Sequence, residues 1–179
     1  MKFLMIIAAT IFAVSTSFAT QVVDLEKSKV NWVGKKKLGD QHAGTVKLKE
    51  AKIGKNGKSG EFVIDLSTIN VGDLKGEWKQ KFEGHMKSDD FFNVSKYPTA
   101  KLVVESVTGN KAKGKLTIKG KTQPVSIAYK KKGKSFIGKV KIDRTKFGLI
   151  YGSKNFFKKL TADKIIQNIF EISFNVVTK

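Results

Sequence analysis

The stretch Phe170-Glu171-Ile172-Ser173-Phe174-Asn175-Val176, close to the C-terminal end, decides the fold because its apolar and polar side chains alternate without a break. In an extended strand, successive side chains point to opposite faces of the sheet. The apolar residues of the stretch therefore share one face, and the polar residues share the other. Such alternation is typical of an antiparallel strand that buries one face and exposes the other to water.

The same period of two recurs along most of the chain from Val22 onward. It is interrupted by clusters of turn-forming residues, of which the clearest are Gly54-Lys55-Asn56-Gly57, Gly109-Asn110 and Lys132-Gly133. The pattern predicts about eight sequential strands. They cover roughly residues 28–36, 43–50, 61–66, 101–108, 113–119, 123–131, 136–142 and 170–176.

One segment, residues 73–88, has a different period. Leu74, Trp78, Phe82 and Met86 recur every four residues, which places them on one stripe of a helix. Two glycines inside the segment weaken such a helix by about 1 kcal/mol each relative to alanine. We therefore expect its stability to come from packing the stripe against an apolar surface, such as the mouth of a barrel.

About eight sequential strands, with no internal repeat and no linker, favour an all-β, mainly antiparallel fold closed as an up-and-down barrel. An open sheet would leave long edges exposed. A sandwich of two sheets is the alternative that the pattern leaves open. An eight-stranded barrel is either filled by its own side chains or holds one small ligand, and composition alone does not distinguish the two.

The first segment, residues 1–19, has the features of a secretory signal peptide. A positive start at Lys2 precedes an apolar stretch from Phe3 to Val14, and small residues lead to Ala19. The apolar stretch is shorter than the roughly 20 residues that span a bilayer. We predict cleavage before Thr20, which leaves residues 20–179 as one exported domain in the periplasm, with secretion as the alternative.

The composition is strongly basic and free of cysteine: 35 Lys and Arg face 15 Asp and Glu, for a net charge of +20. The missing thiols exclude disulfides, cysteine-ligated metals and a thiol nucleophile. Only Arg144 supplies the guanidinium fork that reads base edges, so we expect no nucleic-acid partner. The lysines form either a solvated face or a docking surface for an anionic membrane. A homodimer is also left open.

Motifs of covalent catalysis are absent from the sequence. No Gly-x-Ser-x-Gly elbow occurs, and Gly57-Lys58-Ser59 lacks the upstream glycine of a phosphate loop. His42 and His85 are far apart, and we expect the first in a loop and the second at a helix end. Asp89-Asp90 is expected to cap or turn the chain. We therefore predict a protein that is not an enzyme and needs no metal or cofactor.

Arg144 stands out because every other basic residue is lysine. A single arginine indicates a specific geometry that lysine cannot provide. One interpretation is a buried ion pair with a carboxylate such as Asp89 or Asp90. The other is a fork for the anionic or carbonyl-bearing head of a ligand.

Several motifs in this order resemble the YceI family of exported lipid-binding proteins, and the resemblance covers essentially all of residues 20–179. The motifs are Lys29-Val30-Asn31-Trp32, Gly84-His85-Met86-Lys87-Ser88-Asp89-Asp90-Phe91-Phe92, Tyr97-Pro98-Thr99, Gly114-Lys115-Leu116-Thr117-Ile118-Lys119-Gly120 and Ile142-Asp143-Arg144-Thr145-Lys146-Phe147-Gly148. The resemblance implies a lipocalin-like barrel whose apolar cavity, covered by the helix near residues 73–88, binds an isoprenoid, quinone-like or other amphiphilic molecule.

The resemblance and the alternation together suggest two sets of ligand-binding residues. The set implied by the family motifs lies near the mouth: His85, Asp90, Phe91, Phe92, Arg144 and Phe147. The set inferred from alternation lines the cavity: Trp32, Phe62, Ile64, Leu102, Leu116, Ile118, Ile127, Val140, Phe170 and Ile172.

Two functions follow as hypotheses. The first is a carrier or sequestering protein that holds an isoprenoid, quinone-like or fatty amphiphile inside the barrel. The alternative is a filled barrel whose basic exterior adsorbs to anionic lipid or polymer.

Overall fold

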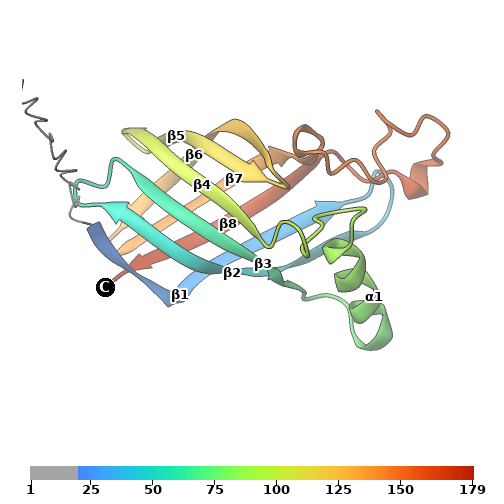
Figure 1. Ribbon diagram of the computed structural model, residues 1–179, viewed down its shortest axis with the longest axis horizontal. Helices are drawn as coiled ribbons and strands as arrows, with labels where there is room; N and C mark the ends of the chain where they lie inside the picture. Colours follow the sequence, from blue (N-terminus) through green and yellow to red (C-terminus); the bar gives the residue numbers. More distant parts are fainter. Residues whose placement is uncertain (1–19) are drawn as a thin grey trace, which may run out of the picture.

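The computed structural model describes residues 20–179, and the predicted signal peptide, residues 1–19, lies outside them. Eight strands follow one another around a closed barrel, and each is antiparallel to its neighbours (Figure 1). The predicted barrel is confirmed, and the two-sheet sandwich is not formed. The strands are β1 (Thr20–Lys35), β2 (Gln41–Gly54), β3 (Gly60–Val71), β4 (Thr99–Thr108), β5 (Lys111–Ile118), β6 (Lys121–Lys132), β7 (Ser135–Asp143) and β8 (Ile169–Thr178).

The barrel closes where the first strand meets the last. β1 pairs with β8 from Val23 opposite Thr178 to Val33 opposite Glu171. Within residues 20–179, this pairing gives every strand a paired neighbour on both sides, whereas an open sheet of the same strands would expose two edges. The predicted turns connect neighbouring strands, and Gly109 and Gly133 adopt positive φ values of 57° and 56° in them, a conformation that glycine adopts without strain.

The first strand begins earlier than the alternation predicts, at Thr20 instead of residue 28. The register of its pairing with β8 shifts between Asp24 and Lys29. At this point the Asp24 carboxylate accepts one hydrogen bond from the Lys27 amide, and the Asp24 backbone carbonyl accepts one from the Ser28 hydroxyl. A bulge of this kind adds residues to one strand and breaks the period of two. The alternation therefore could not be followed back through residues 24–29, and the first half of β1 was not predicted.

Helix α1 (Gly76–Lys87) and the segment 148–168 lie at the same end of the barrel (Figure 1). The helix begins three residues later than the predicted start at residue 73, because the backbone is still extended at Lys75, which precedes the first helical residue. The Asp73 carboxylate contacts β2 instead, at His42 and Ala43. Leu74, Phe82 and Met86 pack against the core as predicted. The fourth residue of the stripe, Trp78, is 72% exposed. Among the described residues, no helix is both long and apolar enough to cross a bilayer.

Gly114 marks a tight approach between β4 and β5. A Cβ atom at this position would collide with the backbone oxygen of Val103. At Gly34, in β1, a Cβ atom would meet no heavy atom within 4 Å. The two glycines thus differ in the space around them, although each lies in a strand with an ordinary φ.

We expect Gly114→Ala to lower the free energy of unfolding by about 1–3 kcal/mol, because one of the two strands must shift to make room. Gly34→Ala is the matched control and should leave stability unchanged or raise it slightly. Urea denaturation of both variants measures the difference. Equal stability of the two would contradict the close approach of β4 and β5.

Candidate functional site: an apolar cavity through the barrel

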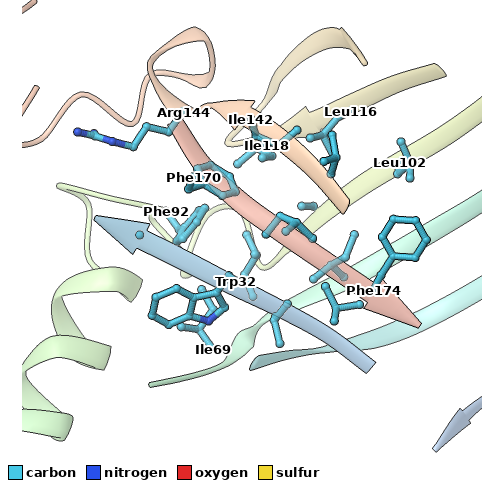
Figure 2. Close-up of a pocket in the computed structure, with 18 of the residues that line it drawn as sticks. Trp32, Ile69, Phe92, Leu102, Leu116, Ile118, Ile142, Arg144, Phe170 and Phe174 are labelled. Carbon is cyan, nitrogen blue, oxygen red and sulfur yellow. The ribbon is translucent and has the colours of Figure 1, made fainter. Parts of the chain in front are cut away.

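A cavity of about 840 Å³ occupies the inside of the barrel, which is therefore not filled by its own side chains. It is lined at one end by residues of α1 and the end of β1, and at the other by Gly57 and Ser59 near the turn between β2 and β3. Figure 2 shows the side chains of several strands converging on this space. The volume falls within the range of ligand pockets, about 300–1,000 Å³.

All ten residues that alternation placed on the cavity wall line the cavity: Trp32, Phe62, Ile64, Leu102, Leu116, Ile118, Ile127, Val140, Phe170 and Ile172. Their part in binding a ligand stays a prediction. Other wall residues were missed, although all but Ile69 lie inside the predicted strands and applying the period of two along each whole strand would have found them. Ile69 is out of step with the alternation, because the pairing register of β3 with β2 shifts between Asp65 and Asn70. The missed wall residues include Val30, Val46, Leu66, Ile69, Val104, Val125, Phe136, Ile142, Phe174 and Val176.

Trp32 joins the cavity wall to the helix. Its ring packs over Gly44, where a Cβ atom would lie 2.7 Å from Cζ2 of the indole. The indole N–H donates to the Thr45 carbonyl at 3.3 Å. On its other side, the ring stacks on Phe82 of α1, with centroids 6.1 Å apart and planes inclined by 7°. Trp32 is therefore held in place and helps to seat α1 on the barrel.

Of the residues predicted at the mouth, His85, Phe91, Phe92 and Arg144 line the cavity. Asp90 is exposed, and it is not among the lining residues. The chain turns tightly here, since the Ser88 carbonyl accepts hydrogen bonds from the amides of both Phe91 and Asn93. The turn directs the two phenylalanines inward and leaves the carboxylate in water.

Phe147 is also absent from the cavity wall. It is 2% exposed and belongs to the packed core. Phe147 is the last residue of the short helix η1 (Arg144–Phe147). Arg144, the first residue of this helix, lines the cavity, whereas Phe147 does not. Phe147 therefore has a structural position in the protein, and its predicted contact with a ligand would require the core to open.

Arg144 is 2% exposed, and its guanidinium donates to three backbone carbonyls. Nε donates to Gln167 at 3.0 Å, Nη2 donates to Ile166 at 3.1 Å, and Nη1 donates to Leu149. The interpretation of Arg144 as the partner of Asp89 or Asp90 in an ion pair is therefore wrong, because backbone carbonyls surround the guanidinium in place of a carboxylate. Both ends of the segment 148–168 are thereby fixed to one side chain.

The cationic form of Arg144 persists at neutral pH. Burial lowers the pKa of Arg144 to about 10, although the nearby Asp143 acts in the opposite direction. Its carbon Cζ lies 6.0 Å from the centre of the Phe91 ring, within reach of a cation–π contact. In Figure 2 the side chain points away from the apolar groups that surround the cavity. A contact with a ligand head stays a prediction.

His85 and Tyr151 face each other at the mouth, with ring centroids 4.4 Å apart. The Phe91 ring lies 6.0 Å from His85 on another side. The Nε2 atom of His85 is buried and finds no hydrogen-bond partner among the described residues. An unpaired buried polar atom is uncommon and costs free energy, so this atom is well suited to meet a polar group of a bound molecule.

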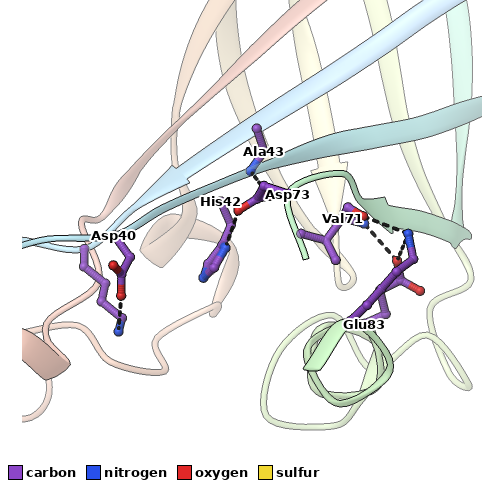
Figure 3. A network of polar contacts seen from close by, with 8 residues as sticks. Asp40, His42, Ala43, Val71, Asp73 and Glu83 are labelled. Carbon is purple, nitrogen blue, oxygen red and sulfur yellow. Dashed lines mark hydrogen bonds and ion pairs between the residues drawn. The ribbon is translucent and has the colours of Figure 1, made fainter. Parts of the chain in front are cut away.

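Polar contacts hold α1 to the barrel (Figure 3). The Asp73 carboxylate accepts from the Ala43 amide at 3.0 Å and lies 2.8 Å from Nδ1 of His42. Glu83, on α1, accepts from the Val71 amide at 2.9 Å and lies 3.3 Å from Nζ of Lys79. His42 was expected in a loop but lies in β2, because the alternation extends two residues further toward the N-terminus than predicted.

These contacts lower the pKa of both carboxyl groups. Partial burial raises the pKa of Asp73, but hydrogen bonds from Ala43 and His42 lower this pKa by more than burial raises it. At Glu83, partial burial likewise raises the pKa, and the Val71 amide and Lys79 together lower it more. Both carboxyl groups are therefore charged at neutral pH. Within residues 20–179, no group of three or more His, Asp or Glu side chains is arranged to hold a metal ion.

The contacts of Arg144 predict that Arg144→Lys lowers the free energy of unfolding by about 2–4 kcal/mol, since the compact lysine ammonium cannot reach all three carbonyls that the planar guanidinium spans, and those left are buried without a donor. Urea denaturation measures the loss. Lys113→Met, which removes an exposed cation of β5, is the control and should be neutral. A variant with unchanged stability that fails to bind amphiphiles would instead support the interpretation of Arg144 as a ligand fork.

The lowered pKa values of Asp73 and Glu83 predict a stability that depends on pH. Carboxyl groups with a folded-state pKa below their ordinary values, 3.8 and 4.5, stabilise the fold above those values. This contribution disappears as pH falls through the folded-state pKa. Asp73→Asn/Glu83→Gln should thus be less stable than the parent at about pH 6 and approach it at about pH 3. A difference that does not change with pH would exclude this origin.

Comparison with known proteins agrees with this architecture. The structure of BcnA from Burkholderia cenocepacia is 26% identical, with a TM-score of 0.66 over 88% of this chain and 99% of that chain. A polyisoprenoid-binding domain from Saccharophagus degradans is 17% identical, with a TM-score of 0.64 over 90% and 98% of the two chains. The Campylobacter jejuni YceI protein is 15% identical, with a TM-score of 0.53 over 100% and 99%.

Among curated proteins, no significant match to the sequence is found. The sequence profile of the YceI-like domain, however, matches residues 21–178, which is the whole barrel apart from Thr20. The motifs that suggested this resemblance all lie within that range. This chain belongs to the YceI family.

Proposed function

We propose that the protein is a periplasmic carrier or sequestering protein that holds an isoprenoid, quinone-like or fatty amphiphile inside its barrel. One observation carries the proposal: an apolar cavity of about 840 Å³ runs through the barrel. Protein interiors are normally packed as densely as organic crystals, and voids cost stability. A cavity of this size is therefore best explained by a molecule that fills it, and a filled barrel with only an adhesive exterior is disfavoured.

The chemistry of the wall favours a long apolar chain as that molecule. Along the middle of the barrel, the wall consists of aliphatic and aromatic side chains such as Leu102, Leu116 and Phe174. Transfer of each CH₂ group from water to such a surface contributes about 0.8 kcal/mol. A long chain can bind tightly by this term alone, so the tail would be selected by length and not by hydrogen bonds.

The ends of the cavity differ in polarity, which supports one orientation of the ligand. His42, His85, Tyr151 and Gln167 line the end at α1, together with the aliphatic stems and charges of nearby lysines. The polar head of an amphiphile would lie here, with Nε2 of His85 available for a hydrogen bond. The tail would point toward the turn between β2 and β3.

The relatives and the sequence support the remaining parts of the proposal. The structure of the Saccharophagus degradans protein is described as a polyisoprenoid-binding domain, and it shares the barrel fold. Residues 1–19 carry the sequence features of a signal peptide, which supports export to the periplasm. No covalent step is proposed, because binding by burial requires none.

Blocking the cavity tests the proposal. We expect Leu116→Trp to lower the affinity for farnesol, a short-chain quinone and palmitate at least about tenfold, because the larger ring occupies space that the tail needs. Lys113→Trp adds the same ring to the outer face of β5 and should bind like the parent. Titration calorimetry measures binding, and thermal denaturation shows that both variants are folded.

Two results would contradict the proposal. The first is a folded parent protein that binds none of the three probes after any co-purified lipid has been extracted. The second is equal loss of affinity in Leu116→Trp and Lys113→Trp, which would place the bound probe on the outside of the barrel.

A further inference from the structure

We infer that the α1 end of the barrel docks on an anionic lipid bilayer, so that the cavity opens against the membrane. The inference rests on the proposed function and adds to it the surface by which the protein meets the source or destination of its ligand. Its basis is a set of exposed apolar side chains at that end, called here the mouth rim: Leu38, Trp78, Tyr151, Phe156 and Phe157.

The mouth rim gathers the exposed aromatic side chains of the described residues at one place. Trp78 is 72% exposed, Phe156 is 53% and Tyr151 is 45%. The exposed large apolar residues outside the rim, among them Val22 and Ile137, are all aliphatic. Exposed aromatic groups concentrated at one end of a soluble domain indicate an interaction surface.

The chain holds these side chains outward by a folded segment. The Ser153 carbonyl accepts hydrogen bonds from the amides of Phe156 and Phe157, and the Lys154 ammonium donates to the carbonyls of Lys158 and Leu160. The Lys37 amide donates to the Ile165 carbonyl, which fixes the turn that carries Leu38 beside the same segment. The rim is thus a preformed surface, and binding need not order it.

The charge around the rim matches an anionic partner. Residues 35–40, 75–87 and 150–165 contain 11 lysines and 4 carboxylates. The Lys81 ammonium lies 5.5 Å from the centre of the Trp78 ring, so basic and aromatic groups are interleaved. Aromatic rings prefer the interface between headgroups and acyl chains, and nearby lysines are attracted to anionic headgroups.

A bilayer fits this surface better than a protein or a nucleic acid. Lysine is depleted at protein interfaces, and the three rim segments lack the arginines that favour recognition of nucleic acids. The rim is also continuous with the cavity, since Trp78 and Tyr151 line it together with Lys35, Lys36 and Lys81. Docking by the rim would let a lipid enter or leave without crossing water.

Vesicle flotation tests the inference with the exported chain, residues 20–179. We expect the protein to float with vesicles of phosphatidylcholine mixed with phosphatidylglycerol, and to stay behind with phosphatidylcholine alone. Phe156→Ser/Phe157→Ser should lower the floated fraction about tenfold. The matched control is Val22→Ser/Ile137→Ser, which removes two exposed apolar residues elsewhere and should float like the parent.

A second pair of variants separates local charge from total charge. Lys158→Glu/Lys159→Glu should lower the floated fraction about tenfold, whereas Lys113→Glu/Lys132→Glu makes the same change in net charge away from the rim and should have a much smaller effect. Brominated lipids should also quench the fluorescence of Trp78, and Trp78→Phe should remove most of that quenching.

The inference is overturned by equal flotation with neutral and anionic vesicles, by no flotation with either, or by control variants that lose as much as the rim variants. The cavity variant Leu116→Trp keeps the two proposals apart, because it should lose the ligand and still float. If the parent floats as expected but binds no amphiphile, docking stands and the proposed carrier function fails.

Discussion

The pairing of β1 with β8 is the constraint on which the rest of the structure depends. It turns eight strands of alternating pattern into a closed wall, so the apolar face of every strand points to one enclosed space. Closure also removes the sheet edges that would otherwise promote aggregation. Because the inward side chains do not fill the space that closure creates, a cavity of about 840 Å³ remains. The proposed binding function is thus a consequence of barrel size and wall composition, and it requires no catalytic residue.

The α1 end adds what the strands alone cannot provide, a mouth with fixed geometry. Arg144 holds both ends of the segment 148–168 through three carbonyls. Asp73 and Glu83 hold the helix to β2 and β3. These contacts place polar groups, exposed aromatic rings and lysines around one opening, while the middle of the cavity stays apolar. Head recognition, chain burial and membrane contact can therefore occupy successive positions along one axis of the molecule.

Local patterns in the sequence predicted most of this arrangement. The period of two located the strands, and the ten residues inferred from it all line the cavity. The four-residue period located α1, although Trp78 turned out to be largely exposed. Long-range contacts could not be predicted in the same way. The carbonyl partners of Arg144 belong to the irregular segment 148–168, which has no period, and the tight turn after Ser88 decides that Asp90 faces water while Phe91 faces the cavity.

Native mass spectrometry of the protein purified from its native cells shows directly whether an amphiphile occupies the barrel. We expect a stoichiometric adduct of lipid size that survives washing at high salt, because an enclosed apolar ligand is not held by charges that salt would screen. Organic extraction should then release a molecule with a long apolar chain. A protein of bare mass that also takes up no prenyl, quinone or fatty ligand when these are added would show that the barrel does not hold an amphiphile.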